Sequence, residues 1–162
     1  MVLAQINLPD PRLRSIIILI ALVTIVIFST SPLRFGAMND VGIIWYNTVV
    51  LIVVILGIPL RVLLPVFIVD PVACIVGMLM RSRRWYRNKT VFGTFAAIIT
   101  SYFCLYYVKE KHHRMLLTFI IPITEGIMDK NDNIGISLVV LSYYWVAQMY
   151  KWPIDFYLKC ID

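Results

Sequence analysis

The segment VGIIWYNTVVLIVVILGIPLRVLLPVFIVDPVACIVGMLM, residues 41–80, decides the fold, and it runs directly into the basic segment RSRRWYRNK, residues 81–89. As one α-helix, residues 41–80 would be about 60 Å long, which is twice the hydrocarbon thickness of a bilayer. The segment is therefore expected to fold back on itself. The breaks are predicted at or near Pro59, Pro65 and Pro71, because each proline removes a backbone donor and clashes with the preceding turn.

Two arrangements of this segment are open. Residues 41–60 and 62–80 could each span a membrane and be joined by a tight turn at Arg61, or residues 62–80 could form a re-entrant hairpin with Asp70 and Pro71 at its apex. Arg61 and Asp70 are the only ionised residues between 41 and 80. One interpretation pairs them across a bend at Pro65, because charges inside a membrane seek partners. In the other, Arg61 extends to the membrane surface and Asp70 caps the half-helix that follows.

The composition is that of a membrane protein. The chain has 162 residues, of which 60% are hydrophobic and only 15% are charged, whereas soluble domains carry about 25% charged residues. We predict an all-α integral membrane protein, a single polytopic domain in which about five to six transmembrane or re-entrant helices, some broken by proline, form a bundle. The first segment is expected to be an uncleaved signal anchor. The expected segments are 15–33, 41–60, 62–80, 91–108, the short 115–128 and 134–150, followed by an interfacial tail, 151–162.

Basic residues are concentrated in one part of the chain. The net charge is +6, and eight of the fifteen Lys and Arg residues lie between Arg81 and Arg114. Beside membrane segments, such charge indicates anionic lipid headgroups rather than nucleic acid. The positive-inside rule places residues 81–89 on the cytosolic side of an endoplasmic reticulum, other endomembrane or plasma membrane, with the mitochondrial inner membrane as a further option. The residues predicted to bind anionic phospholipid headgroups are Arg81, Arg83, Arg84, Trp85, Tyr86, Arg87 and Lys89.

A stripe of small residues marks the helix expected over residues 91–108. Thr94, Ala97, Ser101 and Cys104 recur at i, i+3, i+7 and i+10, and so lie on one face. Small residues on one face allow another helix to approach closely. We predict that these four residues form a helix-packing seam, and the pattern does not identify the partner.

The segment 115–128 is short for a membrane span and contains Pro122 and Gly126. It is predicted to be either a thin, distorted span or a re-entrant segment. Because Glu125 lies within one turn of its end, an interfacial position is favoured over a proton relay. The preceding residues 109–114, with His112 and His113, are interpreted as a solvated loop, since haem ligation in a bundle needs histidines on facing helices.

Motifs of known catalytic chemistry are missing from the sequence. It has no phosphate-binding glycine loop, no paired-cysteine motif, no zinc-binding His-Glu-x-x-His and no nucleophile elbow. The three cysteines are far apart, which fits neither a disulfide framework nor a zinc site. We therefore predict no catalytic residue, no metal and no cofactor, and we expect that the chain is not an enzyme.

These observations favour a non-catalytic accessory or structural subunit of a larger membrane complex, one that handles lipids. Its expected partners are larger membrane protein subunits and anionic phospholipids, and no nucleic acid. The alternative is an oligomeric ion or proton channel, or a small transporter, that uses the charged residues inside apolar segments, Arg61, Asp70 and Glu125.

Overall fold

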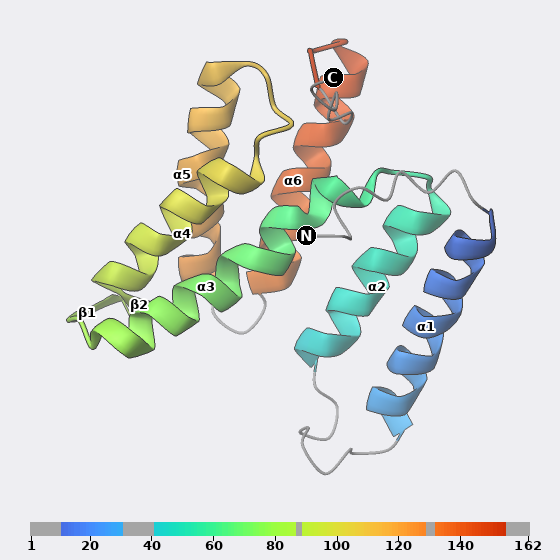
Figure 1. The fold of residues 1–162 in the computed structure, drawn as a ribbon, viewed down its shortest axis with the longest axis horizontal. Helices are drawn as coiled ribbons and strands as arrows, with labels where there is room; N and C mark the ends of the chain where they lie inside the picture. Colours follow the sequence, from blue (N-terminus) through green and yellow to red (C-terminus); the bar gives the residue numbers. More distant parts are fainter. Residues whose placement is uncertain (1–10, 31–40, 87–88, 129–131, 155–162) are drawn as a thin grey trace, which may run out of the picture. The chain divides into compact units, whose positions relative to one another are not determined.

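The computed structural model describes residues 11–30, 41–86, 89–128 and 132–154. Over these residues the chain is helical apart from a small two-stranded hairpin (Figure 1), so the all-α class predicted from the sequence is confirmed. The chain divides into two compact units, Met1–Arg61 and Val62–Asp162, which are described separately. Whether they together make one membrane domain stays a prediction.

The first unit is a pair of helices. Helix α1, Pro11–Thr30, packs antiparallel to helix α2, Val41–Ile55 (Figure 1). A guanidinium nitrogen of Arg14, Nη2, donates to the carbonyl oxygen of Ile55 at 2.5 Å. This carbonyl belongs to the last residue of α2, where the helix dipole favours a cation. The contact therefore ties the first turn of α1 to the last turn of α2.

Helix α2 ends five residues before the expected boundary at residue 60, and Gly57 explains why. The Ile58 N–H donates to the Val53 carbonyl at 2.9 Å and the Gly57 N–H to the Val54 carbonyl at 3.2 Å, which is a Schellman motif. Gly57 has a φ of +69°, a left-handed conformation that costs glycine little. Pro59 then prevents the helix from resuming immediately.

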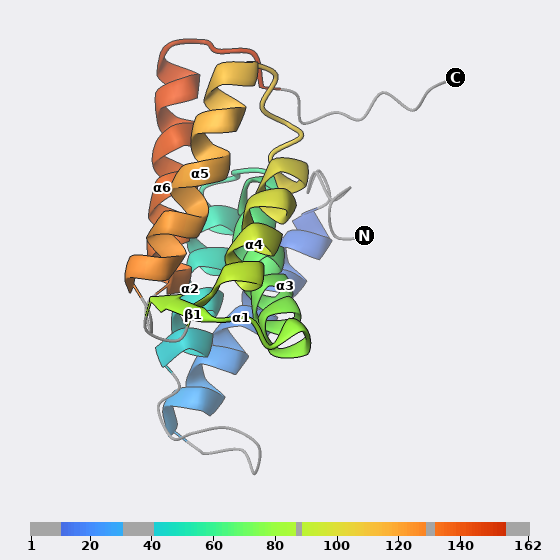
Figure 2. The same cartoon turned by 90° about the vertical axis from the view of Figure 1, so that its left-hand side faces the viewer.

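The second unit contains the remaining helices and the hairpin. A 3₁₀ turn, Leu60–Leu63, begins in the last two residues of the first unit and leads into α3, Leu64–Met80. Strands β1, Arg84–Tyr86, and β2, Lys89–Thr90, follow α3. Helix α4, Val91–Cys104, packs along α3, and α5, Lys111–Met128, contacts both α4 and α6, Asp132–Met149 (Figures 1 and 2). The hairpin lies where α3 ends and α4 begins.

Pro65 and Pro71 behave differently from each other. Pro65 stands in the first turn of α3, where a proline ring is tolerated because the N–H of that position has no helical partner. Pro71 lies inside α3, which continues to Met80. The predicted break at Pro71, and with it the re-entrant apex at Asp70 and Pro71, is therefore wrong. The loss of one helical hydrogen bond is smaller than the gain from packing the rest of α3 against its neighbours.

The polar segment 109–114 also differs from the solvated loop that was predicted. Residues 111–114 form the first turn of α5 rather than a solvated loop. The ring of His113 lies 4.1 Å from the ring of Trp152, and the Tyr143 hydroxyl lies 3.5 Å from its Nδ1 atom. Arg114 donates from Nε and Nη2 to the Tyr102 carbonyl near the end of α4, at 3.0 and 2.7 Å. These side-chain contacts anchor the start of α5 to α4 and to the segment after α6.

Two helical segments among the described residues are long and apolar enough to cross a bilayer, Pro11–Thr30 and Leu60–Met80. Three further apolar helices, Gly42–Ile55, Val91–Cys104 and Asn133–Met149, are shorter. The number of membrane crossings therefore stays a prediction. Residues 155–162 of the expected interfacial tail lie outside the described residues.

Candidate functional site

The hairpin is fastened to the start of α4 by hydrogen bonds. The indole Nε1 of Trp85 donates to the Thr94 hydroxyl at 2.8 Å. The first three N–H groups of α4 also have acceptors in or beside the hairpin: Val91 donates to the Arg83 carbonyl, Phe92 to the Ser82 hydroxyl, and Gly93 to the hydroxyl of the N-cap residue Thr90. The N-terminus of α4 therefore has no donor left among these three for an anion, and anion binding here must come from side chains.

Helices α3 and α4 approach each other closely at two glycines. A Cβ atom added to Gly93 would lie 2.9 Å from the Ala73 carbonyl oxygen and 2.8 Å from the Thr90 hydroxyl oxygen. A Cβ atom on Gly77 would lie 2.6 Å from the same hydroxyl. Since real Cβ atoms almost never come this close to such atoms, a larger residue at either position would force its neighbours to shift. The close approach positions the C-terminal end of α3 beside the hairpin.

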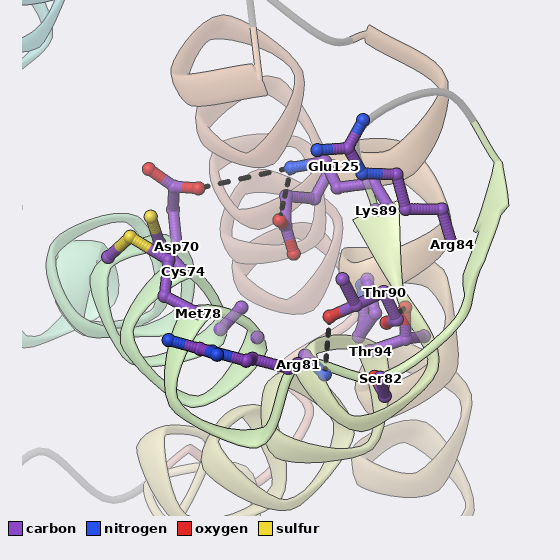
Figure 3. Close-up of a pocket in the computed structure, with 14 residues that line it drawn as sticks. Asp70, Cys74, Met78, Arg81, Ser82, Arg84, Lys89, Thr90, Thr94 and Glu125 are labelled. Carbon is purple, nitrogen blue, oxygen red and sulfur yellow. Dashed lines mark hydrogen bonds and ion pairs between the residues drawn. The ribbon is translucent and has the colours of Figure 1, made fainter.

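An open cavity of about 460 Å³ lies between α3, the hairpin, α4 and α5 (Figure 3). We call it the charged cavity, because three cations and two carboxylates line it. Hydroxyl groups from the hairpin and the start of α4 also face it. Its lining residues are Asp70, Ala73, Cys74, Gly77, Met78, Arg81, Ser82, Arg84, Lys89, Thr90, Gly93, Thr94, Pro122 and Glu125.

Lys89 joins the two carboxylates of the charged cavity. Its Nζ atom lies 2.5 Å from Oε1 of Glu125 and 4.0 Å from Oδ1 of Asp70 (Figure 3). The Glu125 side chain is only 4% exposed, whereas that of Asp70 is 34% exposed. A buried carboxylate needs a close partner to offset the loss of hydration. Lys89 is therefore mainly the partner of Glu125, and Asp70 is held more loosely.

Arg81 and Arg84 supply positive charge that the described residues do not neutralise. Both side chains are exposed, and neither forms an ion pair with another residue of the described ranges. Arg81 is the C-cap of α3 and has φ 43° and ψ 38°, a left-handed conformation. Glycine is the usual residue in that conformation, and other residues adopt it at a cost of about 1 kcal/mol. At the C-terminus of a helix, the positive charge of Arg81 also meets the negative end of the dipole.

Only some of the residues predicted to bind headgroups line the charged cavity. Arg81, Arg84 and Lys89 line the charged cavity, but the ammonium of Lys89 is turned toward carboxylates. Arg83 and Tyr86 are exposed and do not line it. Trp85 is 53% exposed, although its indole N–H is used by Thr94. Arg87 lies outside the described residues.

The predicted seam on α4 lies along the face that the structure buries. Ala97, Ser101 and Cys104 are buried, whereas Thr94 is half-buried and Gly93 takes the first buried position on this face. The helix against which α4 packs most extensively is α3. The small residues of α3 nearest the hairpin are Ala73, which is buried, and Gly77, which is half-buried. They are spaced by four, as are Gly93 and Ala97, and this paired small-xxx-small spacing was the signal in the sequence for this contact.

The three charged residues predicted inside apolar segments do not all belong to the same compact unit. Asp70 and Glu125 both belong to the second unit, where Lys89 brings them to one cavity. Arg61 belongs to the first unit, so its pairing with Asp70 stays a prediction. Glu125 is buried, since the residue as a whole is 3% exposed, and its predicted interfacial position stays a prediction. The role of Lys89 as the partner of Glu125 has no signal in the sequence, because 36 residues separate the two.

A scan against protein-family models, a search of curated proteins and a search of solved structures each find no match to this chain. The functional argument therefore rests on the geometry of the charged cavity and on the surfaces of the helices.

Proposed function

We propose that this chain is an integral membrane protein without catalytic activity, an accessory subunit that binds an anionic lipid headgroup in the charged cavity. The observation that carries the proposal is the pair Arg81 and Arg84. Both guanidinium groups border a cavity and lack an ion-pair partner among the described residues. Guanidinium groups bind phosphate through two parallel hydrogen bonds, which makes a phosphodiester headgroup a suitable ligand.

The surfaces of the helices support a membrane location. Ala21 is the only buried residue of α1, and most of its large aliphatic side chains are exposed. An apolar helix face of this size is costly in water and favourable in lipid. Exposed aromatic and aliphatic residues also cover α4 and α5. They include Phe92, Phe95, Ile99, Phe103, Leu116, Phe119, Ile123 and Ile127.

The serine and threonine hydroxyl groups of the helices form hydrogen bonds within their own helix. Serine and threonine side chains of α1, α2, α4, α5 and α6 each donate to the backbone carbonyl four residues earlier. This arrangement satisfies a polar group inside its own helix, which suits a helix surrounded by lipid. The residues are Ser15, Thr24, Thr30, Thr48, Thr94, Thr118, Thr124 and Ser137. Asn47 does the same toward Ile43.

Removing both arginines from the charged cavity tests the lipid site. The double variant Arg81→Gln/Arg84→Gln is expected to bind phosphatidylglycerol about thirtyfold more weakly, because each cation near an anionic lipid is worth about 1 kcal/mol. Native mass spectrometry of the full chain in detergent, titrated with phosphatidylglycerol, measures the dissociation constant.

The matched control is Lys109→Gln/Lys111→Gln. It removes the same charge from exposed positions of the same unit that do not line the charged cavity. We expect this control to bind the lipid within about threefold of the parent chain, because charges far from a bound headgroup are screened. Equal losses in the two double variants would mean that only net charge matters and would overturn the lipid site.

The accessory role and the channel alternative predict different assemblies. Asp70 and Glu125 meet at Lys89 in an open cavity, and this observation keeps an ion or proton pathway as the second candidate. Gentle detergent purification from the native membrane, followed by mass spectrometry of the proteins that co-migrate, separates the two. An accessory subunit is expected to co-purify with larger membrane proteins in fixed ratio. A symmetric homo-oligomer, whose proton flux in liposomes is changed by Asp70→Asn, would instead support the channel.

A further inference from the structure

Arg81 and Arg84 carry their charges at two separate positions of the charged cavity. Arg81 follows α3, whereas Arg84 belongs to β1, and Figure 3 shows the two guanidinium groups on opposite sides of the cavity. Neither group forms an ion pair with Asp70 or Glu125. A single phosphate can therefore meet only one of the two guanidinium groups. A ligand that uses both needs two anionic groups set apart from each other.

The backbone that carries the two arginines is held in place by hydrogen bonds. The Phe92 N–H donates to the Ser82 hydroxyl at 3.1 Å, and Nε1 of Trp85 donates to the Thr94 hydroxyl at 2.8 Å. These contacts fix the segment from the end of α3 to β1 against the start of α4. A ligand that binds at two fixed points loses less affinity to the ordering of the protein than one that must bring two mobile groups together.

Two hydroxyl groups of the cavity lining can donate hydrogen bonds to the same ligand. Ser82 accepts from the Phe92 N–H, and Thr90 accepts from the Gly93 N–H at 3.2 Å, so the hydrogen of each hydroxyl is not used in these bonds. A hydroxyl group is both a donor and an acceptor. Such groups suit the oxygen atoms of a phosphate or of a polyol.

The carboxylate of Asp70 does not oppose a phosphate at Arg81. Arg81 follows Asp70 by about three helical turns, which separates their backbones by about 16 Å along α3. Asp70 instead lies 4.0 Å from the ammonium of Lys89. The side chain of Glu125 is only 4% exposed, so it presents little negative surface to a ligand.

We propose that the charged cavity binds a lipid headgroup in which two phosphate groups are joined by a short polyol, with one phosphate at Arg81 and the other at Arg84. Cardiolipin, whose phosphates are joined by glycerol, and phosphatidylinositol 4-phosphate, whose phosphates are joined by inositol, share this chemistry. Guanidinium groups bind phosphate through charge-assisted hydrogen bonds. A cavity of about 460 Å³ is within the usual range for small-molecule sites. This inference rests on the proposed function and adds the class of headgroup.

A comparison of cardiolipin with phosphatidylglycerol tests the inference, because both have phosphodiesters on glycerol and only cardiolipin has two. The full chain in detergent, titrated with each lipid under native mass spectrometry, is expected to bind cardiolipin about tenfold more tightly. Arg81→Gln and Arg84→Gln are each expected to weaken cardiolipin binding about thirtyfold, since each removes one of two phosphate contacts. Phosphatidylglycerol keeps the other arginine and is expected to lose about fivefold or less. The preference for cardiolipin should therefore fall to within about threefold.

Two further variants separate the two contacts from the net charge of the protein. Lys109→Gln/Lys111→Gln removes two exposed positive charges outside the charged cavity and is expected to leave the tenfold preference unchanged. Arg84→Lys keeps the charge in place and is expected to keep most of the preference. Both arginines are exposed, so their replacement removes no buried contact. A tenfold preference that persists in both single glutamine variants would overturn the inference.

Phosphatidylinositol 4-phosphate distinguishes the two lipid sources. Whichever of the two lipids binds more tightly, and loses that affinity in each single arginine variant, identifies the polyol that joins the phosphates. Equal binding of cardiolipin, phosphatidylinositol 4-phosphate and phosphatidylglycerol, all weakened by Arg81→Gln/Arg84→Gln, rejects the second phosphate contact and retains the anionic lipid site. No effect of the double arginine variant on any of the three lipids rejects both this inference and the proposed function.

Discussion

Lys89→Met is expected to destabilise the second unit by about 3 kcal/mol, the lower end of the range for breaking a buried ion pair. The ammonium of Lys89 lies 2.5 Å from Glu125, whose side chain is 4% exposed, and methionine would remove the positive charge that lies beside that buried carboxylate. The lower end of the range applies because the Lys89 side chain is 22% exposed, so water can partly replace it. Thermal or denaturant unfolding in detergent measures the change.

A double variant separates the ion pair from the packing of Lys89. In Lys89→Met/Glu125→Gln no charge of the pair remains, and most of the lost stability is expected to return. Lys111→Met, a change of the same kind at an exposed position in α5, is expected to alter stability by less than about 0.5 kcal/mol. A double variant as unstable as Lys89→Met would show that the loss comes from packing rather than from removing the ammonium beside the buried carboxylate.

Gly93→Ala is expected to destabilise the contact between α3 and α4 by about 2 kcal/mol, even though alanine favours helix more than glycine does. The added Cβ would lie 2.9 Å from a backbone oxygen of α3, at Ala73, which cannot move aside as the end of a flexible side chain could. The helices must therefore separate, and the loss of packing exceeds the gain in helix propensity. The melting temperature of the purified chain measures the change.

Gly126→Ala is the matched control, because the same substitution inside α5 places a Cβ with no heavy atom within 4 Å. It is expected to stabilise the chain by up to about 1 kcal/mol. The two glycine variants should therefore shift the melting temperature in opposite directions. Shifts of the same sign and size would mean that the close approach at Gly93 does not limit stability.

The sequence predicts the helices well and their ends less well. Apolar length and composition locate the helical segments, because a lipid-exposed or buried helix needs a long apolar stretch. Gly57 ends α2 earlier than Pro59 alone indicates, and α5 begins four residues before residue 115, within a segment whose charges suggest a loop. In both cases local hydrogen bonds and ring contacts determine where the helix ends or begins, and the hydrophobic pattern of the sequence does not reveal such contacts.

The charged cavity is harder to predict from the sequence than the helices are. The basic segment 81–89 is evident from composition, and Arg81 and Arg84 do line the cavity. Nothing in the chain indicates that Lys89 would turn toward Glu125, because that pairing depends on how α5 packs beside the hairpin. Asp70 and Glu125 appear unrelated in the sequence for the same reason. Pairings between distant residues follow from tertiary packing, which periodicity alone does not determine.

The left-handed backbone of Arg81 carries an evolutionary consequence. Glycine at this position would relieve the backbone strain and leave the end of α3 intact. It would also delete one of the two guanidinium groups that border the charged cavity. Under the proposed function, selection for stability alone and selection for headgroup binding favour different residues here. Under that proposal, the arginine at a position suited to glycine is a trade-off in which the chain gives up backbone stability to keep a positive charge at the end of α3.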